Sequence, residues 1–284
     1  MYRTLKLVAW FASQLSQRGV QLVGWLITTL SFDVLRLRRR VVLANLGIAF
    51  GEEIPPNELV KIGRRSIYHF VLTFLELFRS KKHNISQDVK ILGRHHLDGA
   101  LKEGQGVYCL CFHLGNWEAM CSAMTRQVTP SHVVVKKVGG DHLNRFVDEM
   151  RTHNEFHWVR KNKGEKGTAY PKIVEILDRN EIVGFAFDQA RPGEPRLPFF
   201  GRGAKTNTSL AAIWRKRPAP IVPGFIRRVK PGSHILEFLP PLDMKITEDP
   251  TQDVLDHSKQ FNQVVESVVR QYPDQYFWMH NRWK

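Results

Sequence analysis

The segment VYCLCF, residues 107–112, most constrains the fold, because none of its side chains is charged. A strand with one face in water alternates polar and apolar residues, whereas an uninterrupted apolar run is typical of a strand covered on both faces. Short runs rich in Val, Ile and Phe recur at 132–137, 182–188, 220–228 and 234–242. We therefore expect a buried central sheet.

Longer polar-apolar segments alternate with these strands and have helical patterns. The predicted helices lie near residues 116–127, 142–154, 169–180, 207–217 and 251–272. Alternating strands and helices favour an α/β fold, in which a mixed, largely parallel sheet is flanked by helices. Two more helices are predicted before the sheet, separated by Pro55 and Pro56.

The length and composition favour one domain with an N-terminal addition. The chain has 284 residues, of which 43% are hydrophobic, and it shows no internal repeat and no Gly/Ser linker. We predict a helical membrane-associating segment at 1–40 and a catalytic domain at 41–284. Cys109, Cys111 and Cys121 lie close together in apolar sequence, which argues against a disulfide framework and for a reducing compartment.

The charge of the chain points to anionic partners. There are 42 Lys and Arg residues against 27 Asp and Glu, a formal net charge of +15. Nucleic acid, anionic lipid, a phosphorylated substrate and an acidic protein all fit this excess. Nucleic-acid binding would require aromatic residues interleaved with the basic ones or a recognised module, and the sequence offers neither.

The first forty residues favour a shallow membrane anchor. The longest uncharged run, 19–32, has 14 residues, whereas a helix that spans a bilayer needs about 20. An amphipathic or hairpin-like anchor would place Trp10 and Trp25 at headgroup depth. Four arginines would meet anionic headgroups: Arg36, Arg38, Arg39 and Arg40. The alternative is a pair of ordinary core helices.

His113 and Glu118 frame a candidate catalytic turn. Residues five apart on a helix point about 140° away from each other, so the two side chains converge only if His113 ends a strand. Gly115 permits a turn there and Asn116 is a good helix N-cap. An imidazole held by a carboxylate suits a general base that takes a proton from a hydroxyl.

Two other interpretations of His113 remain open from the residues alone. The ring could simply satisfy a hydrogen bond at a strand end. Cys109, Cys111 and His113 could also share one strand face and bind a metal, but C-x-C-x-H lacks the separated ligand pairs of zinc sites, so we predict no metal. No Ser or Cys nucleophile accompanies the pair, which favours direct attack by a substrate hydroxyl on an activated acyl group.

The sequence HLGNWE, 113–118, resembles the H-x-x-x-x-[DE] box of the bacterial lipid A biosynthesis acyltransferases, the lauroyl/myristoyl transferases of the glycerolipid acyltransferase superfamily. Three further blocks resemble the family in the same order, over nearly the whole chain. They are LRRRVVLANLGIAFG (37–51), FAFDQARPGEPRLPFFGRGAKTNTSLA (185–211) and YPDQYFWMHNRWK (272–284). Gly51 stands where the family usually has a proline.

The resemblance implies roles for three catalytic residues. His113 is the general base, and Glu118 orients and charges it. Arg151 lies some thirty residues after Glu118 and would stabilise negative charge on a thioester oxyanion or a substrate phosphate. Arg145 and Arg160 are alternatives to Arg151.

The resemblance also implies substrate-binding residues: Asp188, Gln189, Asn116, Arg160, Phe199 and Phe200. Asp188 would be hydroxyl-binding or support the catalytic residues, with Gln189 beside it. Phe199 and Phe200 either line an acyl groove or form a hydrophobic plug under a loop. Arg282 in the closing block either packs structurally or binds a phosphate.

The family resemblance implies transfer of a fatty acyl chain to a hydroxyl of a lipid A precursor. The expected donor is a thioester on acyl carrier protein, with no cofactor besides this co-substrate. The acceptor is a phosphorylated saccharolipid in an anionic leaflet, so we expect a peripheral or monotopic protein at the inner membrane with its active site facing the cytoplasm. A lysophospholipid or glycolipid acceptor is the alternative.

Overall fold

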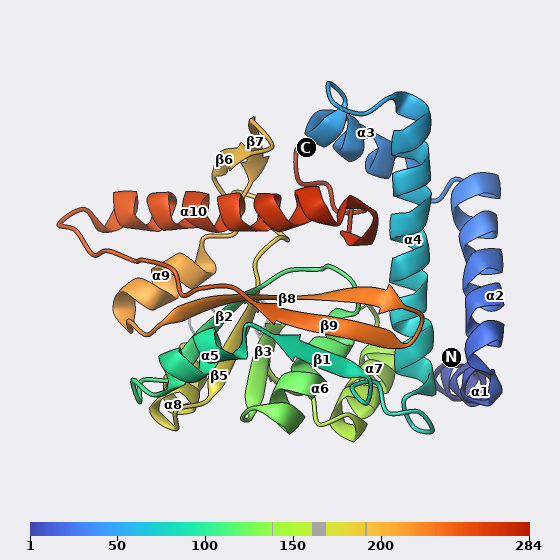
Figure 1. Ribbon diagram of the computed structural model, residues 1–284, viewed down its shortest axis with the longest axis horizontal. Helices are drawn as coiled ribbons and strands as arrows, with labels where there is room; N and C mark the ends of the chain where they lie inside the picture. Colours follow the sequence, from blue (N-terminus) through green and yellow to red (C-terminus); the bar gives the residue numbers. More distant parts are fainter. Residues whose placement is uncertain (138, 161–168, 191) are drawn as a thin grey trace.

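The computed structural model describes residues 1–137, 139–160, 169–190 and 192–284. Within these residues, seven strands form one central sheet in the order β1-β9-β8-β2-β5-β3-β4 (Figure 1). The strands are β1 (Val89–Leu92), β2 (Val107–Cys111), β3 (Ser131–Val135), β4 (His157–Arg160), β5 (Ile182–Ala186), β8 (Ile221–Lys230) and β9 (Ser233–Phe238). Of the neighbouring pairs, β8 and β9 are antiparallel and the rest are parallel. The predicted α/β class is confirmed.

Helices cover both faces of this sheet (Figure 1). One face packs against α5 (Arg94–Leu101), α6 (Trp117–Gln127) and α7 (Asp141–His153). The other packs against α8 (Tyr170–Asp178), α9 (Ser209–Lys216) and α10 (Pro250–Gln271). A hairpin of β6 (Arg196–Phe199) and β7 (Arg202–Lys205) lies beside α10. A short 3-10 turn, η2 (Pro273–Gln275), follows α10 in the chain.

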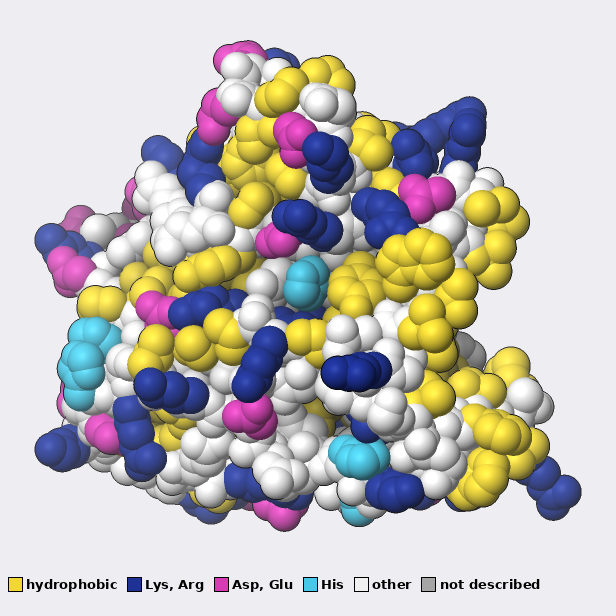
Figure 2. All heavy atoms as spheres, turned by 45° about the vertical axis from the view of Figure 1, so that its right-hand side comes forward, with side chains coloured by type: hydrophobic (Ala, Val, Ile, Leu, Met, Phe, Trp, Pro, Cys, Tyr) yellow, Lys and Arg dark blue, Asp and Glu magenta, His cyan; other side chains and the backbone are white. Residues whose placement is uncertain are grey.

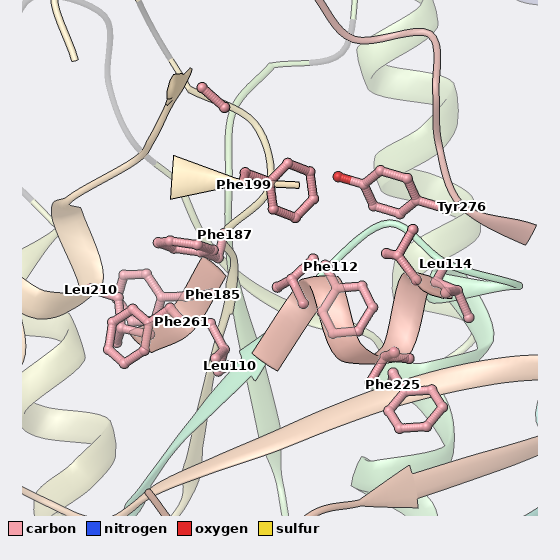
Figure 3. Close-up of a cluster of buried hydrophobic side chains, with 14 of the residues drawn as sticks. Leu110, Phe112, Leu114, Phe185, Phe187, Phe199, Leu210, Phe225, Phe261 and Tyr276 are labelled. Atoms are coloured by element: carbon pink, nitrogen blue, oxygen red, sulfur yellow. The ribbon is translucent and has the colours of Figure 1, made fainter. Parts of the chain in front are cut away.

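Strand β2 shows why an unbroken apolar run forms here. All five of its residues are buried. Tyr108 and Leu110 belong to the core cluster on one face, while Cys109 and Cys111 belong to the cluster on the other. Figure 3 shows the first cluster, in which Leu110 and Phe112 lie near the aromatic side chains of neighbouring elements. A charge at any of these positions would have to be desolvated in one of the two cores.

Five helical segments precede the sheet: α1 (Tyr2–Gln14), α2 (Gln17–Thr28), the π-helical turn η1 (Thr29–Val34), α3 (Arg39–Phe50) and α4 (Pro56–Arg79). The long helix α4 stands at one end of the sheet, with α1 and α2 against its outer side (Figure 1). Pro56 is its first residue, as the Pro-Pro break predicts, since proline lacks only an N–H that has no helical partner there.

No individual helix in the described part of the chain is both long and apolar enough to cross a membrane. The segments Gln17–Val34 and Arg39–Phe50 are together long and apolar enough for a membrane span, but a bend of 85° separates them.

Candidate active site

His113 and Asp188 meet because they follow neighbouring parallel strands. Cys111 at the end of β2 is in register with Ala186 at the end of β5, and each of the two polar residues lies two positions further on. The Nδ1 atom of His113 is 2.8 Å from Oδ1 of Asp188, and its backbone N–H donates to Oδ2 at 3.0 Å. Since an ionised carboxylate only accepts, Nδ1 carries the proton, and in the neutral imidazole Nε2 keeps its lone pair.

Charge and burial oppose each other in this pair. Burial alone would lower the pKa of His113, but the charge and hydrogen bond of Asp188 outweigh it, so the pKa is raised. Burial would likewise raise the pKa of Asp188, and the His113 contacts bring it below its ordinary value. The histidine side chain is 20% exposed and the aspartate 1%, so the imidazole alone is accessible to substrate.

The prediction that Glu118 orients the imidazole is wrong in its geometry. Both Glu118 oxygens bond instead to Arg151, at 3.0 Å to Nε and 2.7 Å to Nη2. Glu118 is the second residue of α6, and this position directs it toward α7, which carries Arg151. The two side chains are 3% and 9% exposed, a buried ion pair next to the histidine.

The turn between His113 and α6 is built as the sequence predicts. Gly115 has φ of +60°, and a Cβ there would lie 2.2 Å from the carbonyl oxygen of Ile226. The side chain of Asn116 caps α6 by accepting from the backbone N–H of Ala119 at 3.1 Å.

Asn116 itself does not fit the predicted substrate-binding role. It is fully buried, and its amide donates to Glu76 Oε2 at 2.6 Å. Its two polar ends are thus engaged inside the protein, because the start of α6 packs against α4.

The C-terminal segment runs beside the catalytic turn and closes one side of it. Leu114 and Tyr276 form an antiparallel bridge. The backbone N–H of Phe277 donates to the carbonyl of His113 at 3.0 Å, and that of Gly115 to Gln275 at 3.1 Å. The ring of Phe277 lies 5.8 Å from the imidazole and that of Trp117 5.1 Å, and the two rings are 6.1 Å from each other. The aromatic run QYFW was the available sequence signal for this wall.

An apolar cavity of about 460 Å³ opens at His113. Its aromatic lining includes Phe70, Phe74, Trp117 and Phe277. Side chains from α6, α7 and β3 also line it, among them Met120, Met124, Val133 and Val147. Polar lining residues include Lys136, Lys137 and Asn207. Met120 and Met124, four residues apart on α6, were not predicted as site residues, although this spacing places them on one helix face.

Gln189 and Arg151 also line this cavity. Nε2 of Gln189 lies 3.4 Å from Nε2 of His113, so it is placed to contact whatever the imidazole contacts.

Arg160, Phe199 and Phe200 lie outside the cavity lining. Arg160 pairs with Asp148 at 2.5 Å and with Asn144 at 3.0 Å on the outer side of α7. Phe199 and Phe200 are buried, 4.8 Å apart between ring centres. These two phenylalanines form a hydrophobic plug rather than an acyl groove, because α10 and the C-terminal segment cover them.

A strand-end imidazole held by a carboxylate and opening on an apolar cavity suits an enzyme that transfers a proton beside an aliphatic chain. The sequence profile described as bacterial lipid A biosynthesis acyltransferase matches residues 3–284. The chain therefore belongs to the bacterial lipid A biosynthesis acyltransferase family, and it is an acyltransferase.

Individual relatives are distant. The lipid A biosynthesis lauroyltransferase of Escherichia coli (strain K12) is 23% identical over 286 residues, 98% of this chain and 89% of that protein. A lipid A biosynthesis acyltransferase of Haemophilus influenzae is 24% identical over 204 residues, 71% of this chain and 60% of that protein. The E. coli (strain K12) lipid A biosynthesis palmitoleoyltransferase is 24% identical over 203 residues, 68% of this chain and 60% of that protein.

Proposed function

We propose that this acyltransferase moves a fatty acyl chain from acyl carrier protein to a hydroxyl of a lipid A precursor, with His113 as the general base. The observation that carries the proposal is the imidazole in the lining of an apolar cavity, with Nδ1 bonded to Asp188. The family supports a lipid A-type acceptor.

In this mechanism His113 Nε2 takes the proton of the acceptor hydroxyl as its oxygen bonds to the thioester carbonyl carbon. The carbonyl becomes a tetrahedral oxyanion. When it collapses, the carbon–sulfur bond breaks, and the departing thiolate takes the proton from the imidazolium to become a thiol. Asp188 stabilises the imidazolium between these two steps, because its buried carboxylate holds Nδ1–H throughout.

Arg151 is proposed to stabilise the oxyanion. Glu118 occupies its Nε and Nη2, and Nη1 has no hydrogen bond within the described residues. A buried guanidinium that lines the cavity and is fixed at one end is preorganised for a developing negative charge. Burial against the apolar lining favours a thioester oxygen over a lipid phosphate as its partner, since a phosphate would need further desolvation.

The acyl chain is proposed to lie in the cavity beyond Arg151. Its methionine, valine and phenylalanine lining offers no hydrogen bond to a substrate, as an alkyl chain requires. The volume of about 460 Å³ is within the range of small-molecule sites.

The N-terminal helices are proposed to hold the enzyme on the anionic inner membrane. Figure 2 shows hydrophobic side chains gathered on its right-hand side, with Lys and Arg side chains around them. Exposed apolar residues of α1, α2, η1 and the following turn are Leu7, Val8, Trp10, Phe11, Leu22, Trp25, Leu26, Ile27, Leu30, Val34, Leu35 and Leu37. Arg36, Arg38 and Arg40 are exposed beside them, and each such cation near an anionic surface contributes about 1 kcal/mol.

The test is acyl transfer by the purified enzyme. Acyl carrier protein carrying a labelled acyl chain is incubated with a lipid A precursor, a lysophospholipid and a glycolipid, and the products are separated by mass. Label should enter the lipid A precursor. Label in one of the other lipids would support the alternative acceptor, and label in none would refute the proposal.

His113→Ala is the matched active-site variant. It should lose transfer by at least about 10³-fold while keeping its fold, because the base is removed. His95→Ala, which removes an exposed histidine on α5, is the control and should keep full activity.

A further inference from the structure

Arg282 is a buried cation without an ion-pair partner. It is 2% exposed, and among the described residues no carboxylate lies within 4.0 Å of its guanidinium. Its group lies over the Phe199 ring, 3.8 Å from the centre, and bonds to the side-chain oxygen of Asn262. Buried charges are costly unless an opposite charge compensates them. The charge of Arg282 acts on the Asp188 carboxylate, whose pKa it helps to lower.

Tyr276 connects this cation to the active site. The Nη1 of Arg282 donates to the Tyr276 hydroxyl at 3.4 Å. The charge of Asp188 also acts on this phenol and raises its pKa. The phenol side chain is 4% exposed, and Figure 3 shows its hydroxyl pointing toward Phe199. Burial and then Asp188 raise the pKa of Tyr276, so it remains a neutral donor.

The backbone fixes Tyr276 in this place. Gln275 and Phe277, on either side of it, bond to Gly115 and His113. Tyr276 itself is bridged to Leu114. Tyr276 and His113 are thus held by the same short pair of antiparallel segments.

We infer that Tyr276 and Arg282 are positioning residues for the His113 base: Arg282 holds the Tyr276 hydroxyl, and that hydroxyl fixes and partly neutralises the Asp188 carboxylate. The inference rests on the proposed role of His113. Neither residue lines the cavity, so their effect on the reaction passes through Asp188. The inference explains why Tyr276 and Arg282, which do not contact the reacting atoms, are buried beside the active site.

Several charged groups surround the pair, and the sign of the effect depends on all of them. Asp188 and Glu118 favour the protonated imidazole, and Arg151 opposes it. Arg282 lowers the pKa of Asp188, while His280 and Lys136 lie near the same groups. Removing the hydroxyl or the guanidinium leaves the Asp188 charge less neutralised, so the pKa of His113 should rise in either variant.

The test measures the pKa of the His113 imidazole by NMR titration, with its signals assigned from a His113→Gln variant. Tyr276→Phe and Arg282→Met should both raise this pKa, and Arg282→Lys, which keeps the charge, should raise it less. Tyr108→Phe is the control, since it removes another buried phenol, bonded to Arg217 away from the site. It should leave the His113 pKa unchanged.

Kinetics provide the second measurement. Tyr276→Phe should lower kcat about tenfold with KM unchanged, and should move the acidic limb of the kcat/KM profile to higher pH. An unchanged His113 pKa in folded Tyr276→Phe would overturn the inference, and this variant alone decides if Arg282→Met does not fold. The titration needs no turnover: absence of acyl transfer by the wild-type enzyme would refute the proposed function and leave the titration result standing.

Discussion

The buried ion pair of Glu118 and Arg151 is better explained by the proposed catalytic use of its cation than by a contribution to folding stability. Two charged side chains in an apolar cavity cost desolvation that their mutual attraction only partly returns. In the proposed mechanism the fixed guanidinium lowers the activation barrier by stabilising the oxyanion, and this would explain why such a pair is kept despite its cost.

We therefore expect Glu118→Gln and Arg151→Lys to lower kcat by about 10²–10³-fold with little change in KM, since the two-bond ion pair that fixes the cation is lost in both. Initial rates of acyl transfer across substrate concentrations measure this split. Arg160→Lys is the control, because Arg160 pairs with Asp148 outside the cavity. A rise in KM with an unchanged kcat would assign Arg151 to substrate binding instead.

At the same scale, the sequence identifies His113 but not its partner. Glu118 is the neighbour in the chain, whereas Asp188 is the neighbour in the sheet. Pairing of the strands ending at 111 and 186 was not deducible from hydrophobic patterns, which report burial but not strand order. Two polar residues at equivalent positions past two buried strands were nevertheless a visible signal for their meeting.

At the scale of elements, the long buried strands and amphipathic helices are predictable because their patterns are strong. The predicted strands at 107–112, 182–188 and 220–228 match β2, β5 and β8 to within a few residues. The strands missed, β1, β4, β6 and β7, have four residues each and include exposed positions. Such short segments acquire strand geometry from their neighbours rather than from their own composition.

The turn before α6 gives a prediction about stability. Gly115→Ala should lower the free energy of unfolding by about 1–3 kcal/mol and weaken activity, because φ of +60° and the nearby Ile226 carbonyl both exclude a Cβ. Gly47→Ala, in α3 with open space around its Cβ position, should be neutral or stabilising by up to about 1 kcal/mol. Denaturant unfolding of both variants measures the contrast. Equal stability of the two would show that the turn relaxes at no cost.

At the scale of the whole molecule, the proposed membrane binding depends on the basic charge and the exposed apolar helices together. Vesicles containing anionic lipid should bind the enzyme more tightly than neutral vesicles, and added salt should weaken that binding.

A double variant Trp10→Ser, Phe11→Ser should reduce the bound fraction in vesicle sedimentation several-fold, since two exposed aromatic side chains of α1 are lost. Val229→Ser with Ile246→Ser is the control, because these residues are comparably exposed elsewhere in the chain. Equal losses in the two variants would refute the assignment of the N-terminal helices as the membrane surface.

The account as a whole depends on an imidazole whose basicity is set by Asp188. The most direct measurement is the pH dependence of kcat/KM for acyl transfer by the wild type and by Asp188→Asn. The carboxylate raises the pKa of His113, so its loss should move the acidic limb to lower pH and reduce kcat by about 10³-fold or more. An Asp188→Asn enzyme with the wild-type profile and rate would contradict the account.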